Sequence, residues 1–136
     1  MATNTPNPGL TTAAVTLGTT SLVVEVADTD AEREQGLSDR TSLLPGHGML
    51  FIFDQAGMPG FWMKDMQFSL DMIWADQSGT VVSITQDATP GSYNASNPQA
   101  SQVFYPSKPA KYVLEVPAGF AAENGIVAGS IMHIGQ

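Results

Sequence analysis

The sequence predicts a mainly β protein, a compact β-barrel or jelly-roll-like sandwich with one or two short helices. Three observations indicate this class. Short runs of β-branched and aromatic residues recur along the chain, turn residues rich in glycine, proline and aspartate separate them, and only two short stretches have helical character. Short strands that alternate with turns are typical of sandwiches and barrels.

The first predicted elements are two strands that form a hairpin. Residues 13–28 contain two β-branched runs, and residues 18–20 between them provide a turn. Val24 and Val26 alternate with Glu25, which is the period of a strand with one buried face. We therefore expect two antiparallel strands at the start of the domain.

Two short helices are expected among the strands. The stretch at residues 28–30 offers aspartate and threonine as caps for a helix over residues 31–35, and Gly36 ends it. Residues 118–126 favour one or two further helical turns that stop at Gly125.

Strand patterns dominate the chain from Gly48 onward. Glycine, proline and aspartate turns separate these strands, and residues 88–101 form a long polar loop without periodicity. The further predicted strands are 48–53, 60–64, 70–76, 80–88, 102–105, 111–116 and 130–134.

The composition indicates one folded domain of ordinary globular type. The chain has 136 residues, of which 43% are hydrophobic, and it contains no cysteine. We predict a disordered spacer rich in proline, asparagine and threonine at residues 1–10 and a single β domain at residues 11–136. The lack of cysteine excludes disulfides, thiolate metal sites and a cysteine nucleophile.

The charge of the chain limits its partners. It has 13 acidic and 5 basic residues and a net charge of −8, which argues against nucleic acid as a partner. No apolar run is long enough to span a bilayer. The first residues are similar to the spacer that follows a signal peptide, so we expect a monomeric protein that is secreted or in the cell envelope, periplasmic or lipoprotein-like, with its targeting segment removed.

A candidate site lies in the apolar stretch FWMKDMQFSLDMIWAD, residues 61–76. It contains Lys64, and it contains Asp71 between the apolar residues Leu70 and Met72. If two antiparallel strands meet here, Lys64 and Asp71 form an ion pair beside a pocket floored by Trp62. The alternative is a purely structural pair that fixes the turn. With Tyr105 and Arg40 added, these residues form the predicted ligand-binding set.

Two further charged residues have open interpretations. Arg40 can donate to Asp71, to Glu115 or to loop carbonyls, or it can pin its loop to the barrel. Asp71 and Glu115 together could provide the two carboxyl groups that a glycosidase-like hydrolase requires, which is the catalytic alternative. His47 and His133 have no metal-ligand spacing, so we expect no metal and no other cofactor.

Three segments in order carry a resemblance to a known family. EREQGLSDRTSLLPGHGMLFIF, FWMKDMQFSLDMIWADQSGTVVSI and YPSKPAKYVLEVPAGFAAENGIVAGS resemble the successive signatures of the domain of unknown function 192 family. The resemblance runs from about Leu22 to the C-terminus. It implies a compact β-barrel or jelly-roll-like fold and a position outside the cytoplasm, but no established activity. Ser38 and Ser130 depart from the family pattern, which has methionine and aspartate there.

The sequence therefore favours a non-catalytic binding or accessory domain outside the cytoplasm. Its expected ligand is a small polar molecule or a glycan segment. The alternatives are the hydrolase that uses Asp71 and Glu115, or a structural protein of an envelope complex.

Deletion of residues 1–9 tests the predicted boundary of the domain. Because this segment is polar, contains proline and has no strand or helix pattern, its removal should lower the melting temperature by less than about 2 °C. Thermal unfolding followed by circular dichroism measures the change. A clearly larger loss would mean that the segment is docked on the domain.

Overall fold

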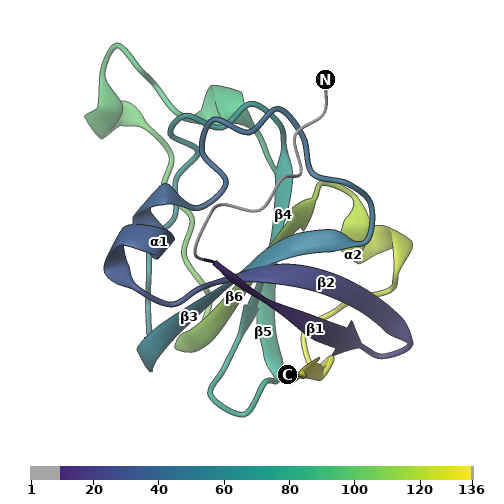
Figure 1. Cartoon of the computed structure of the whole chain (residues 1–136). Coiled ribbons are helices and arrows are strands. Elements are labelled where there is room, and N and C mark those ends of the chain that lie inside the picture. The colour runs from purple at the N-terminus through teal and green to yellow at the C-terminus, as the bar shows by residue number, and fades with distance from the viewer. Residues whose placement is uncertain (1–9, 136) are drawn as a thin grey trace.

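The structure, a computed structural model, describes residues 10–135 (Figure 1). Most of the predicted spacer, residues 1–9, lies outside the described residues. Leu10, which the sequence assigned to the spacer, is half-buried and packs against a hydrophobic core. The folded part of the chain thus includes this residue.

Seven strands form one strongly curled sheet, which confirms the mainly β prediction (Figure 1). Their order across the sheet is β5-β4-β6-β3-β2-β1-β7. The strands are β1 (Thr11–Leu17), β2 (Thr20–Ala27), β3 (His47–Gly57), β4 (Leu70–Ala75), β5 (Val81–Ala88), β6 (Ala110–Pro117) and β7 (Met132–Ile134).

The curl gives the sheet the form of a half-barrel. Strands β2 and β3 run parallel, joined by a crossover that carries the first helix, and the other paired strands are antiparallel. The last strand approaches the turn between β4 and β5, where Thr80 bridges to Ile131 and Met132 N donates to Gly79 O at 2.8 Å. These bonds connect the two ends of the sheet.

Both predicted helices are present. Helix α1 (Asp30–Gln35) begins with a capping box in which Thr29 and Glu32 each accept a hydrogen bond from the other's main-chain N–H. Helix α2 (Phe120–Glu123) follows β6. Two 3₁₀ turns, η1 (Pro90–Ser92) and η2 (Pro98–Ala100), lie in the long polar loop.

Two predicted strands, residues 60–64 and 102–105, are wrong. These segments lie over the sheet and pair with each other at a single bridge, where Phe61 N donates to Phe104 O at 2.9 Å and Phe104 N to Phe61 O at 2.7 Å. No sheet edge is open to them nearby, because β4, β6 and β3 already have neighbours on both sides.

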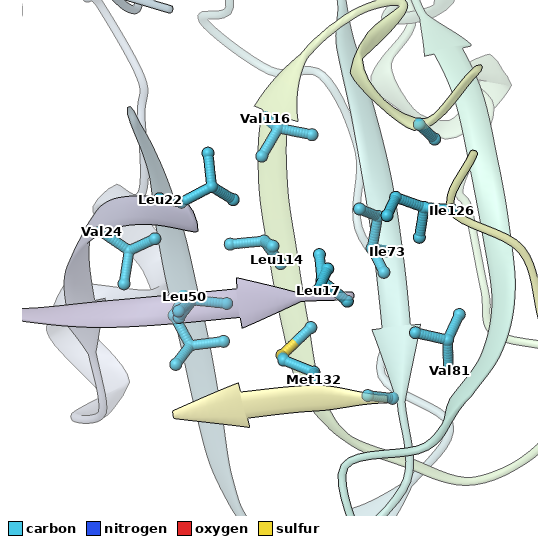
Figure 2. Close-up of a cluster of buried hydrophobic side chains, with 13 residues drawn as sticks. Leu17, Leu22, Val24, Leu50, Ile73, Val81, Leu114, Val116, Ile126 and Met132 are labelled. Carbon is cyan, nitrogen blue, oxygen red and sulfur yellow. The ribbon is translucent and has the colours of Figure 1, made fainter. Parts of the chain in front are cut away.

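The concave face of the sheet encloses one core (Figure 2). All seven strands contribute to it, so their side chains converge from opposite parts of the half-barrel, and the region around α2 adds to it. Its buried members are Val15, Leu17, Leu22, Val24, Leu50, Ile73, Ala75, Val81, Leu114, Val116, Ala121, Ile126 and Met132.

A second core covers the convex face, which we call the outer face. Here Met49, Phe51, Met72 and Trp74 pack against loop residues, among them Leu37. The sheet is therefore buried on both sides, and all six residues of β4 are buried. This explains why the stretch around β4 is so apolar.

Asp71 of β4 is the polar exception on the inner face, where it lies opposite Val116 of β6. Only 1% of Asp71 is exposed. Its Oδ1 accepts the N–H of Asp87 at 2.9 Å, and its Oδ2 accepts the N–H groups of Gly119 and Ala121 at 3.2 and 3.0 Å. Because the N-cap residue of α2 is Gly119, which has no side chain, Asp71 supplies the missing cap.

The predicted ion pair between Lys64 and Asp71 is not formed. Lys64 is exposed on a loop over the outer face, and the carboxylate of Asp71 bonds to main-chain amides. The reason is topological: β4 pairs with β5 and β6, and residues 60–64 do not lie beside it in the sheet.

Replacing Asp71 with Ala should destabilise the protein by about 3 kcal/mol, because three main-chain N–H groups, one buried and two partly buried, would lose their acceptor. Chemical denaturation gives the free energy of unfolding. Asp54→Ala on an exposed part of β3 is the matched control and should cost less than about 0.5 kcal/mol. Equal, small losses in both variants would contradict the capping role. Asp76 is a poor control because it accepts hydrogen bonds from Ser78 and Thr80.

Candidate functional site

A pocket of about 640 Å³ opens on the outer face of the sheet. Helix α1 and the loop after it form one side, and residues 59–66 form the other. Strands β3 and β6 provide the floor through Phe51 and Glu115. The pocket is thus built from two irregular segments that lie over a rigid sheet.

Glu115 of β6 lies at the floor of this pocket, between two methionines of the neighbouring strands. Its neighbours across the strands are Met49 of β3 and Met72 of β4, and only 5% of Glu115 is exposed. Within residues 10–135 no hydrogen bond or ion pair reaches its carboxyl group. Burial raises the pKa of the Glu115 carboxyl from 4.5 to about 8, since the charged form loses its hydration.

Three phenylalanines form the walls. Phe61 packs edge to face on Phe51, with ring centroids 5.0 Å apart, and on Phe53 at 6.2 Å. Phe61 also contacts Trp74 of β4 at 5.4 Å in the same geometry. These edge-to-face contacts fix the rings, so the apolar part of the pocket is preformed.

The end of α1 lies close to this aromatic wall. Gly36 has a φ of 49°, and a Cβ atom there would be 3.2 Å from the Phe51 ring. A larger residue at this position would therefore be strained and crowded. Arg33 of α1 donates to Ile52 O at 2.6 Å and to Asp30 at 2.7 Å, and its guanidinium lies 5.1 Å from the Phe53 ring centre.

Hydrogen bonds join the two loops at the lip of the pocket. Asp39 N donates to Asp65 O at 2.8 Å, and the Ser38 hydroxyl donates to Lys64 O at 3.4 Å. Asp39 and Asp65 have left-handed φ angles of 67° and 60°, which few residues other than glycine adopt. The bonds between the loops hold this lip in one shape.

The pocket contains three of the residues that sequence analysis singled out: Trp62, Lys64 and Glu115. Trp62 is 42% exposed and packs edge to face on Tyr93, with ring centroids 5.1 Å apart. Tyr105 is 58% exposed and lies beside the pocket, where its ring covers Gly60.

Arg40 and Asp71 lie outside the pocket. Both terminal nitrogens of Arg40 donate to the Glu25 carboxylate, at 2.6 and 2.7 Å, in a buried pair. Arg40 thus pins its loop to β2, as the alternative interpretation had it, and its predicted acceptors Asp71 and Glu115 were wrong.

The carboxylate pair of the hydrolase alternative is not formed either. Asp71 lies opposite Val116, and Glu115 lies opposite Met72, so the two acids project from opposite faces of the sheet. They cannot act together on one substrate.

Sequence reasoning missed much of the pocket. Nothing in the sequence around them marks Phe51, Phe53 and Phe61 as pocket residues, or Asp39 and Asp65 as left-handed. The one available signal was the single glutamate in the apolar run YVLEV, residues 112–116, which marks Glu115.

Within residues 10–135, no group of three or more histidine or acidic side chains is placed to hold a metal ion. No helix in this part of the chain is long and apolar enough to cross a membrane.

Comparisons with known proteins give one family and several relatives. The profile of the DUF192 family, described as Uncharacterized ACR, matches residues 13–134. A UPF0127 protein of Pyrococcus abyssi is 33% identical over 101 residues, which is 71% of this chain and 72% of that protein.

Two crystal structures resemble the whole domain. A putative transcription regulator from Sinorhizobium meliloti has a TM-score of 0.84 and 30% identity, and the match covers 95% of this chain and 98% of that one. A protein of unknown function from Novosphingobium aromaticivorans has a TM-score of 0.76 and 29% identity, and the match covers 97% of this chain and 93% of that one.

The raised pKa of Glu115 makes the stability of the protein depend on pH. The folded state favours the protonated carboxyl, so this contribution to stability is full below pH 4.5 and is lost as the pH rises through about 8. Relative to Glu115→Gln, which cannot ionise, the wild-type protein should therefore lose up to about 4 kcal/mol of unfolding free energy across this window.

Urea denaturation at a series of pH values from 5 to about 9 measures this difference. Glu34→Gln on the exposed rim of the same pocket is the control and should follow the wild-type curve. Parallel curves for the wild-type and Glu115→Gln proteins would show that the carboxyl is well solvated.

Proposed function

The chain belongs to the DUF192 family, and from that premise we propose that it is a small-molecule-binding domain, not an enzyme, with its ligand in the pocket over Glu115. The ligand is a small polar molecule or a sugar unit of a glycan. One observation carries the proposal: a buried carboxyl without a partner among residues 10–135 lines a pocket of about 640 Å³.

The unpartnered carboxyl supports binding because it is costly for the fold. A buried polar group without a hydrogen bond destabilises a protein by about 1–3 kcal/mol, and a buried charge costs more. A ligand with a complementary polar group offsets this cost when it binds. Unsatisfied, titratable groups inside a pocket are typical of functional sites.

The remaining surfaces suit a ligand with an apolar part. Phe51, Phe53 and Phe61 offer ring surfaces inside the pocket, and Trp62 offers an exposed indole at its edge. Such a combination of apolar walls with few polar groups is usual for small-ligand sites of this volume. Aromatic rings of this kind also pack on the faces of sugars and other flat ligands.

The acids of the chain favour binding over catalysis. Acid–base hydrolysis of a glycoside needs two carboxyl groups that face one substrate. Glu115 lines the pocket, whereas Asp71 is on the other face and serves as a cap for α2. The other acids at the pocket lie on its exposed rim or lip.

Nucleic acid is a less suitable ligand, although one similar structure is named a putative transcription regulator. The chain has 5 basic residues against 13 acidic ones. Two of the basic residues, Arg33 and Arg40, are already paired with carboxylates. Binding to a phosphate backbone depends on many free cations, so this charge balance opposes it.

The compartment is part of the proposal. We infer a protein that acts outside the cytoplasm, and the support for this is the Thr/Asn/Pro-rich start of the sequence. Expression of the full-length gene in its own host, followed by cell fractionation and immunoblotting, tests it. Recovery in the cytosolic fraction alone would contradict this part.

A fragment screen by ¹H–¹⁵N NMR tests the binding function. Polar aromatic fragments and monosaccharides should shift the amide signals of Glu115, Phe61 and Trp62. Ser38→Tyr at the lip should block the pocket and weaken such hits by at least about tenfold.

Gln77→Tyr, on the exposed turn between β4 and β5, is the matched control and should leave the hits unchanged. Hits that map elsewhere, or that bind the Ser38→Tyr variant equally well, would reject the pocket as the ligand site.

A further inference from the structure

We propose that the pocket selects an organic cation, a primary ammonium or guanidinium group on an aromatic or apolar stem, which binds with its charge beside Glu115. This inference rests on the proposed function and names the chemical class of its ligand. Three features of the site support it: another carboxylate in the same row, the charge balance and the aromatic wall.

The sheet itself shows how a buried carboxylate on this face is satisfied. Glu25 of β2, Met49 of β3 and Glu115 of β6 are consecutive partners in one row across three strands. Two strand spacings put the two glutamates about 10 Å apart on the same face. Glu25 is paired in a bidentate manner with Arg40, at 2.6 and 2.7 Å, but no cation of the described chain pairs with Glu115. A cationic ligand would neutralise the carboxylate of Glu115 as Arg40 neutralises that of Glu25.

The charges around the pocket also favour a cation. Besides Glu115 itself, the acids Glu34, Asp39 and Asp65 line the pocket, against Arg33 and Lys64. Arg33 is balanced by Asp30 at 2.7 Å and also donates to a main-chain carbonyl. The remaining charge at the pocket is negative, and the whole chain carries −8, so an anionic ligand would be repelled and a cation attracted.

The aromatic wall accepts positive charge. The Arg33 guanidinium already lies over the Phe53 ring, with its Cζ 5.1 Å from the ring centre. A desolvated cation near phenyl rings gains from their electron-rich faces. The neighbouring rings of Phe51 and Phe61 would cover the stem of such a ligand.

Binding of a cation here would release a proton. In the empty pocket burial raises the pKa of Glu115 to about 8, so the carboxyl is mostly protonated at neutral pH. A bound ammonium group stabilises the carboxylate, so the proton leaves when the ligand enters. Affinity should therefore rise with pH, by up to about tenfold per unit, until the pH reaches about 8.

A test must distinguish the effect of Glu115 on binding from the effects of the other charged groups near the pocket. Arg33 and Glu34 approach the pocket from α1, Asp39 from the loop after it, and Lys64 and Asp65 from the opposite loop. Glu25 lies on the same row and is neutralised by Arg40, which comes from the loop after α1. Lys64 is the one pocket cation that forms no ion pair within residues 10–135. Its ammonium group is therefore the one that could compete with a cationic ligand for the carboxyl group of Glu115.

Isothermal titration calorimetry with three probes of matched shape tests the inference. The probes are 2-phenylethylamine, 2-phenylethanol and phenylacetate, each titrated at pH 6 and pH 8 into the wild-type protein and into Glu115→Gln, Glu34→Gln and Lys64→Gln. The amine should bind at least about tenfold more tightly than the alcohol and the acid. Its affinity should be greater at pH 8, and titrations in two buffers with different ionisation enthalpies should show proton release.

Each variant has a distinct expected result. Glu115→Gln should remove the preference for the amine and its pH dependence, but should leave the weak binding of the alcohol. Glu34→Gln, which removes one charge from the exposed rim, should weaken the binding of the amine only slightly and keep its pH dependence, and Lys64→Gln should keep or strengthen the binding of the amine.

Three outcomes would overturn the inference. Tighter binding of the alcohol or the acid would leave the proposed function intact but reject a cationic ligand. Unchanged amine binding in Glu115→Gln, or no binding of any probe, would also reject it, and the fragment screen then decides separately whether the pocket binds small molecules at all.

Discussion

The sheet is buried on both faces, and every polar side chain on its central strands must therefore be satisfied within the fold or by a ligand. The inner face packs into the half-barrel (Figure 2), and the outer face packs under the loop after α1 and the other long loops. Among residues 10–135, four charged residues are buried: Glu25, Arg40, Asp71 and Glu115. How each of them is satisfied accounts for much of the architecture.

Three of the four charges are used to fix irregular segments to the sheet. Asp71 receives the main-chain amides at the start of α2 and so holds this helix over the end of the half-barrel. The pair between Arg40 and Glu25 holds the loop that follows α1 on β2. Buried ion pairs add little net stability, but they define one arrangement because other arrangements leave a charge unpaired. The outer loops are thus held in the positions that form the pocket.

Glu115 is the fourth charge, and it serves no such structural purpose in residues 10–135. Its direct neighbours on both sides in the sheet are the methionines Met49 and Met72, so its cost is not offset within the described chain. A residue that costs stability in the free protein is most simply explained by a gain on binding. One fold supports many functions, so it is Glu115, and not the half-barrel, that points to the pocket.

Local sequence patterns are sufficient to predict most of the local structure of this protein. Alternating apolar residues, glycine turns and helix caps depend on neighbours within a few positions, so both helices and seven of the nine predicted strands are confirmed, although β3 extends to Gly57, beyond its predicted end at Phe53. Lys64, Asp71 and Glu115 also stand out in the sequence, because each is a charged residue in an otherwise apolar stretch.

The partners of those residues follow from the fold and not from local patterns, because strand order and register depend on contacts between distant parts of the chain. Residues 60–64 were expected beside β4, but β5 and β6 occupy both of its sides. Asp71 and Glu115 are on adjacent strands, yet a difference of one position in register puts them on opposite faces, since side chains alternate along a strand. That single offset makes Asp71 a cap for α2 and leaves Glu115 in the pocket.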